Sequence, residues 1–162
     1  MKRGATIVLQ IVLLLLGAGV LGLLLLEPQV EGRNVNATQF EIYFKDPFLA
    51  YIYLAFVPFF VGLYQGLTIL GYAGRDEIFS QRSVRAFRII KYCALIMKTF
   101  FLGAVAYLFI FIRGTDDIAG GVAMGVFVIL ACVVVGTVAA VFERTLQNAV
   151  HNRSKNDLTV KK

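Results

Sequence analysis

Residues 126–135 read VFVILACVVV, ten apolar side chains in succession. A helix of a soluble bundle carries polar residues at helical spacing on its outer face, and this run has none. It lies within Ile118–Phe142, a stretch of 25 residues. The hydrocarbon core of a bilayer, about 30 Å thick, is crossed by roughly 20 helical residues. The stretch therefore predicts a membrane-spanning helix.

Three further stretches have the same length and character: Ala5–Leu26, Phe48–Tyr72 and Tyr92–Ile112. The four together account for 93 of the 162 residues. Charged residues make up only 16% of the chain, whereas an ordinary soluble domain has about 25%. We predict an all-α polytopic membrane protein, an antiparallel four-transmembrane-helix bundle that forms a single domain over residues 1–162.

Basic residues alternate between the two sides of these spans. Twelve Lys and Arg side chains precede the first span, lie in the loop 73–91 or follow the last span in the tail 143–162, whereas the outer loop 27–47 and the connection 113–117 hold three. Because Lys and Arg accumulate on the cytoplasmic side of a membrane, both termini are predicted to be cytoplasmic. The net charge of +6 is explained by this topology. We therefore expect the lipid bilayer, and no nucleic acid, as a direct partner.

The end of the loop 73–91 is amphipathic. From Ser83 onward, apolar side chains fall on one helical face and Arg85, Arg88 and Lys91 on the other. Ser80 or Ser83 is a suitable N-cap for this helix. The three cations could contact anionic lipid head groups, which attract basic side chains by roughly 1 kcal/mol each. Ordinary positive-inside charge is the alternative interpretation.

Lys98 is a cation inside an apolar span, two turns beyond Lys91. An unpaired charge at the centre of a span costs about 3 kcal/mol on insertion scales. In a structural interpretation, its stem reaches back to the head groups or its amino group meets Glu143. In a functional interpretation, Lys98 forms a cytoplasm-facing polar pocket with Gln65 and Tyr64, which counting from the span ends places nearly level with it. Such a pocket would suit a small transporter or channel subunit.

Residue types of common catalytic and metal centres are scarce. No Asp or Glu lies within a span, and His151 is the only histidine. The two cysteines, Cys93 and Cys132, are expected to lie roughly 13–15 Å apart along the helix axes, too far for a disulfide. We therefore predict no enzyme activity, no metal site and no cofactor.

Small residues recur at a spacing of four, as in Gly62 and Gly66 or Gly121 and Gly125. This spacing lets helix backbones approach closely, within one bundle or in a homo-oligomer. The pattern does not distinguish the two.

The apolar pattern weakens after Phe142 without ending at once. Leu146, Ala149 and Val150 still recur among polar residues. The last helix is therefore predicted to continue for a few turns beyond the membrane and then to give way to a polar tail, Asn152–Lys162.

Two cytoplasmic motifs resemble those of a known family. They are IFSQRSVR at residues 78–85, continuing to IKYCA at 90–94, and SKNDLTV at 154–160. On these motifs the whole chain resembles a bacterial family of small four-span membrane proteins, the domain of unknown function 2975. The family tail usually has Glu where this chain has Lys155. The resemblance implies a four-span architecture in the bacterial inner membrane.

The resemblance also implies a role. Members of the family look like partners of small helix-turn-helix regulators encoded beside them, which would suit signalling or regulation. On this chain the matching positions form a candidate cytoplasmic partner surface: Phe79, Ser80, Ser83, Asn156, Asp157 and Leu158. The alternative is that the serines cap a helix and the tail folds against the base of the bundle. The leading hypothesis is a non-enzymatic membrane protein that acts through a partner or in envelope signalling; a small transporter or channel subunit is the alternative.

Overall fold

A computed structural model describes residues 3–30, 47–75, 77–112 and 118–160, with the side chains of residues 3, 27–30 and 156–160 excepted. Most of the predicted outer loop 27–47 and the connection 113–117 lie outside the described residues. The described part consists of four long helices and one short π-helical turn. They are α1 (Arg3–Val30), α3 (Pro47–Gly74), α4 (Gln81–Tyr107), η2 (Leu108–Ile112) and α5 (Ala119–Val160).

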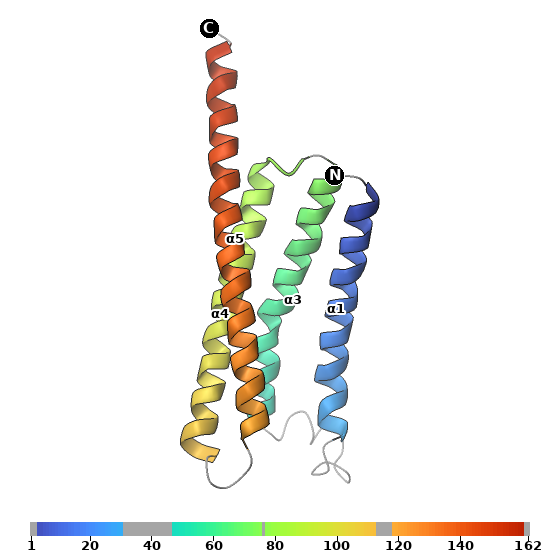
Figure 1. The fold of residues 1–162 in the computed structure, drawn as a ribbon, viewed down its shortest axis with the longest axis vertical. Coiled ribbons are helices and arrows are strands. Elements are labelled where there is room, and N and C mark those ends of the chain that lie inside the picture. Colours follow the sequence, from blue (N-terminus) through green and yellow to red (C-terminus); the bar gives the residue numbers. More distant parts are fainter. Residues whose placement is uncertain (1–2, 31–46, 76, 113–117, 161–162) are drawn as a thin grey trace.

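Each of the four long helices contains a stretch long and apolar enough to cross a membrane. The all-α, four-span fold class predicted from the sequence is confirmed. Successive helices run in opposite directions, and each packs on the next one along the chain: α1 on α3, α3 on α4, and α4 on α5 (Figure 1). Large apolar side chains such as Leu15 of α1 and Phe127 of α5 are exposed, as expected of helices solvated by lipid.

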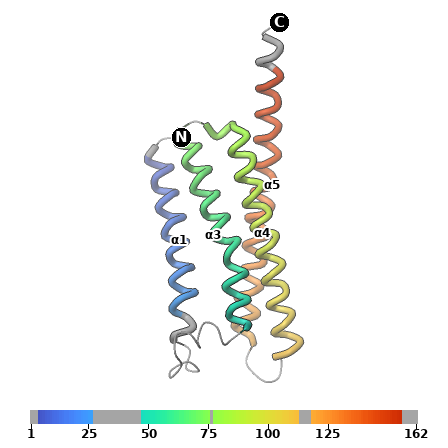
Figure 2. The backbone as a smooth tube through the Cα atoms, turned by 180° about the vertical axis from the view of Figure 1, so that it is seen from behind, coloured from blue at the N-terminus to red at the C-terminus, as the bar shows by residue number. Residues whose placement is uncertain are grey.

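One end of the bundle carries most of the described cations. The start of α1, the end of α3, the start of α4 and the C-terminal part of α5 all lie at this end (Figure 1). We call it the basic end; its cations include Arg82, Arg85 and Arg88 of α4 and Arg144 of α5. The end of α1, the start of α3, the end of η2 and the start of α5 lie at the opposite end (Figure 2).

The core of the bundle lies between α3, α4 and α5. Its buried centre consists of Ala55, Met97, Phe101 and Cys132. Phe56 of α3 meets Phe101 of α4 edge to face, with ring centroids 5.4 Å apart. Because lipid tails are as apolar as these side chains, close packing rather than transfer from water holds the helices together.

Two tyrosines of α3 tie it to its neighbours on either side. The hydroxyl of Tyr51 donates a hydrogen bond to the carbonyl of Phe100 in α4, at 2.8 Å. The hydroxyl of Tyr53 donates to the carbonyl of Leu24 in α1, at 2.5 Å. Residue 28, four positions after Leu24, is a proline and has no N–H to donate to this carbonyl. Tyr53 thus satisfies a backbone acceptor that lipid cannot.

The connection between α3 and α4 is shorter than the predicted loop 73–91. The carbonyl of Tyr72 accepts the N–H groups of Arg75 and Glu77, which turns the chain after α3. Ser80 is the N-cap of α4: its backbone is extended and its hydroxyl accepts the N–H of Ser83. Of the two caps that the sequence allowed, the structure uses Ser80. The amphipathic segment 81–91 is therefore the first part of α4.

The last helix is much longer than predicted. Phe87 of α4 is stacked on Phe142 of α5, and α4 begins six residues before Phe87, so its start is level with Asn148. Residues 149–160 continue beyond that point, a distance of about 18 Å at 1.5 Å per residue. We call residues 149–160 the α5 extension (Figure 2). The prediction that the helix ends near Asn152 was wrong, because no Gly or Pro interrupts residues 143–160.

Gly125 tests how tightly α4 and α5 pack. A Cβ atom at Gly125 would lie 2.5 Å from a methyl carbon of Val105, whereas one at Gly120 of the same helix would meet nothing within 4 Å. We expect Gly125→Leu to lower the free energy of unfolding by about 1–3 kcal/mol through overpacking, and Gly120→Leu to have little effect. Thermal unfolding in detergent, followed by circular dichroism at 222 nm, measures both. Equal stability of the two variants would contradict this packing.

Candidate functional site

A buried carboxylate joins α5 to α4 at the basic end. Glu143 is only 6% exposed. One of its oxygens accepts a hydrogen bond from Nε of Arg88 at 2.6 Å, and the other accepts one from Nζ of Lys91 at 2.5 Å. Both cations come from the amphipathic first part of α4. Charge-assisted hydrogen bonds of this kind are about twice as strong as neutral ones, so Glu143 fixes the position of α5 beside α4.

This arrangement revises two predictions about cations. Glu143 contacts Arg88 and Lys91, not Lys98 as the structural interpretation allowed. The reason is depth, since Lys98 lies two turns beyond Lys91 in α4. Of the three cations expected to face lipid head groups, only Arg85 is without an ion pair to a described residue; it is exposed.

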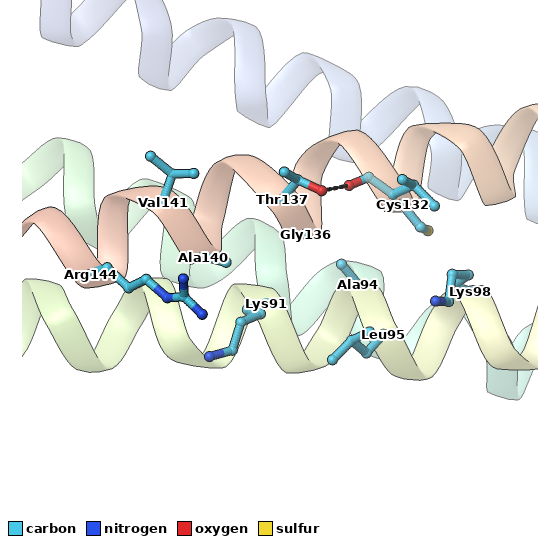
Figure 3. A pocket seen from close by; sticks show the side chains of 11 residues that line it. Lys91, Ala94, Leu95, Lys98, Cys132, Gly136, Thr137, Ala140, Val141 and Arg144 are labelled. Carbon is cyan, nitrogen blue, oxygen red and sulfur yellow. Dashed lines mark hydrogen bonds between the residues drawn. The ribbon is translucent and has the colours of Figure 1, made fainter.

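A groove of about 390 Å³ lies beside this ion pair, between α4 and α5 (Figure 3). Lys91, Leu95 and Lys98 line it from α4, and Val133, Gly136 and Arg144 are among the residues that line it from α5. The amino group of Lys98 lies on the side toward Lys91 and the basic end (Figure 3). Its side chain thus reaches back along α4, as expected for a lysine inside an apolar span.

The groove does not include the other two residues of the predicted pocket. Gly62 of α3 faces Cys93 of α4, and Phe56 meets Phe101. These contacts between antiparallel helices place Lys98 level with residues 57–59. Gln65 and Tyr64 lie five or more residues nearer the basic end, which is about 8 Å or more along the axis. Counting from the span ends pairs residue 72 with residue 91, but α4 begins at Gln81, so the true pairing of α3 and α4 is shifted.

Tyr64 and Gln65 therefore remain separate from Lys98. Tyr64 is 66% exposed and lies outside the groove. Within the described residues, no hydrogen bond joins either side chain to Lys98. The structure thus brings Lys98 together with α5 rather than with α3.

The predicted partner surface is also divided. Phe79 is exposed just before α4. Ser80 caps α4, and Ser83 is fully buried at 0% exposure, with its hydroxyl 3.3 Å from that of Ser80. The capping alternative is therefore confirmed for Ser80, and Ser83 is not part of a surface.

The second half of that predicted surface lies in the α5 extension. Asn156, Asp157 and Leu158 belong to α5, but their side chains lie outside the described residues. Asp157 lies nine residues beyond the level at which α4 begins, about 13 Å along the axis. The tail does not fold against the base of the bundle: α5 continues past it as a helix (Figure 1). The two halves thus do not form one continuous surface.

Arg144 is a groove residue that the sequence analysis did not single out. It follows Glu143 directly, and Val133, Gly136, Thr137, Ala140 and Arg144 recur at helical spacings of three and four. Such spacing places them on one face of α5. The periodicity was readable in the sequence, but which helix this face meets was not. In the described part of the chain, no group of His, Cys, Asp and Glu residues could hold a metal ion.

Comparison with known proteins gives two matches. A family model described as "Protein of unknown function (DUF2975)" matches residues 34–160. The uncharacterized membrane protein YoaS of Bacillus subtilis strain 168 is 35% identical over 161 residues, which cover 99% of this chain and 100% of that protein. No solved structure matches the chain.

The contribution of Glu143 can be measured by removing its charge. In Glu143→Gln, the cations of Arg88 and Lys91 lose their counter-charge and one hydrogen bond loses its acceptor. We expect the free energy of unfolding to fall by about 1.5–3 kcal/mol, because hydrogen bonds to charged groups contribute about that much. A thiol-reactive fluorophore that reports exposure of buried Cys132 on heating provides the measurement. Glu77→Gln makes the same chemical change at an exposed position and should leave the melting temperature unchanged.

Proposed function

We propose that this chain, which belongs to the DUF2975 family of proteins of unknown function, is a non-enzymatic membrane anchor that presents the α5 extension to a soluble partner protein. Its place would be the bacterial cytoplasmic membrane, and its role regulatory. The observation that carries the proposal is the projection of a single helix beyond the rest of the bundle (Figure 1).

The surface of the α5 extension supports docking. Residues 151–155 are exposed on every side of the helix. A helical segment that is polar all round has no apolar face to pack against its own chain, and bridging between domains is one role of such helices. The α5 extension holds Arg153 and Lys155 against one acid, Asp157, and Lys161 and Lys162 follow it in the sequence. Such a helix favours an acidic partner surface, because complementary charge speeds encounter and suppresses wrong partners.

The direction of the extension favours a protein over the membrane surface. The helix continues along the line of its own span, away from the bundle (Figure 2). Arg153 lies 11 residues beyond Phe142, the last residue of the apolar stretch, which is about 16 Å. The attraction of anionic head groups falls off within a Debye length, about 8 Å at physiological ionic strength. The distal cations are therefore better placed for a soluble protein than for lipid.

Two features of the sequence support a non-enzymatic role. The spans contain no carboxylate, and the single histidine, His151, lies in the α5 extension. A proton-coupled transporter of this size would need an ionisable acid inside the membrane. The transporter alternative also relied on one pocket of Lys98, Gln65 and Tyr64, which the helix register separates.

The proposed orientation places the basic end in the cytoplasm, by the excess of Lys and Arg there. Alkaline phosphatase fused after Val160 should then be inactive, because it matures only outside the cytoplasm, and a fluorescent protein at the same site should be bright. The same pair of fusions within the outer loop, after Asn36, should give the opposite result. An active phosphatase after Val160 would overturn the orientation and with it the cytoplasmic partner.

Docking can be tested by site-specific crosslinking in cells. A photoreactive amino acid in place of His151, on the α5 extension, should trap one soluble protein, while the same probe at Leu130, an exposed apolar position of the span, should not. The crosslink should weaken at least about tenfold with Arg153→Glu and persist with Arg153→Lys, since only the first reverses the charge. Crosslinks from residue 151 that survive Arg153→Glu, or that form only with lipid, would contradict the proposal.

A further inference from the structure

We propose that the groove between α4 and α5 binds one anionic phospholipid, with its phosphate held by Lys98, its head group directed toward Arg144 at the basic end, and an acyl chain against the apolar lining. This inference goes beyond the docking role of the α5 extension and does not depend on it. It rests on two cations that share one lipid-facing groove (Figure 3).

Among the described residues, the bundle leaves two cations of the groove without a counter-charge. Glu143 directly precedes the groove residue Arg144, and Arg88 and Lys91 occupy both oxygens of Glu143. Lys98 and Arg144 form no ion pair with any other residue that the structure describes. A lysine two turns inside an apolar span is costly unless an anion accompanies it. A negatively charged group bound between Lys98 and the basic end would therefore be stabilised by the groove.

The shape and chemistry of the groove walls suit an acyl chain. Ala94, Gly136 and Ala140 line the groove, so small side chains leave a slot where larger ones would fill it. A Cβ atom at Gly136 would lie only 3.4 Å from that of Ala94, which means that the two backbones approach closely below the slot. The hydroxyl of Thr137 already donates to the carbonyl of Val133, at 2.7 Å. The floor is thus apolar in effect and suits a hydrocarbon chain.

The groove is accessible to lipid from the side of the bundle. Leu95, Val133 and Val141 line the groove and are exposed large apolar residues. In a membrane these side chains face lipid, so a lipid enters the groove sideways without crossing protein. The volume of about 390 Å³ lies in the range of ordinary ligand pockets, about 300–1,000 Å³. Basic pockets between transmembrane helices are known to bind phosphate-bearing lipid head groups.

A second copy of this chain fits the groove less well. Its small residues would accept a neighbouring helix, but the four spans contain no Asp or Glu that could pair with Lys98. A helix from another copy would leave that cation uncompensated. An anionic lipid supplies both the charge and the apolar surface.

Lipid binding can be measured on the purified full-length chain in detergent. After delipidation, the protein is titrated with phosphatidylglycerol or with phosphatidylcholine of the same acyl chains, and bound lipid is counted by native mass spectrometry. We expect one phosphatidylglycerol per chain, bound at least about tenfold more tightly than phosphatidylcholine. Equal binding of the two lipids would overturn the proposal.

Three variants test whether the preference for phosphatidylglycerol comes from the groove or from the general surface charge. Lys98→Met keeps the length of an apolar side chain and should abolish the preference for phosphatidylglycerol while the fold holds. Gly136→Leu fills the slot, keeps every cation and should also reduce phosphatidylglycerol binding at least about tenfold. Arg82→Gln removes an exposed charge at the start of α4 and should leave the preference intact. Undiminished binding by Lys98→Met would overturn the proposal, and this variant decides the question if Gly136→Leu does not fold.

Two further outcomes distinguish other occupants. If inorganic phosphate raises the melting temperature of the protein as much as phosphatidylglycerol does, the site binds a free anion and not a lipid. If the chain elutes as a dimer whose dissociation requires Gly136→Leu, a second copy occupies the groove. Either result would overturn the lipid assignment.

Discussion

The carboxylate of Glu143 is the contact on which the arrangement of the basic end depends. By holding Arg88 and Lys91 it fixes the register of α5 against α4, and the stacked rings of Phe87 and Phe142 lie next to it. The contact forms where the apolar stretch of α5 ends, so both helices must continue beyond the membrane together. A buried carboxylate without its cations would be costly, which makes this register the one that α4 and α5 adopt.

The register between α4 and α5 determines both the charge of the groove and the length of the α5 extension. It engages the nearest acid fully, so Lys98 and Arg144 face the groove without a counter-charge from Glu143. It also sets the level at which α4 begins, beyond which α5 continues alone. The groove and the α5 extension thus arise from the same contact, although one faces lipid and the other water. On the two proposals made above, one part of α5 would bind a lipid and another would meet a soluble partner.

The chain belongs to a family of proteins of unknown function. The positions of its polar side chains favour some classes of function over others. The relative in Bacillus subtilis aligns over its full length, so its architecture is expected to be the same. A catalytic or transport role would need reactive groups gathered inside the membrane. Here the polar groups within the spans are dispersed: Tyr64 and Gln65 lie on α3 near the basic end, and Lys98 faces α5. Docking at the basic end accounts for more of the features of this chain than transport does.

The four spans, their order and the end at which basic residues gather could all be predicted from the amino-acid sequence, because each depends only on the length and composition of single segments. It also identified the amphipathic start of α4 and the N-cap alternatives, since capping is a local interaction. The partners of Glu143 and Lys98 were decided by tertiary structure, because they depend on the register between helices. A shift of about two turns in the assumed pairing of α3 and α4 was enough to separate Gln65 from Lys98. The length of α5 was underestimated for another reason. The polar segment after Phe142 contains no Gly or Pro that would end a helix. It stays helical because it continues a membrane span that is already a helix.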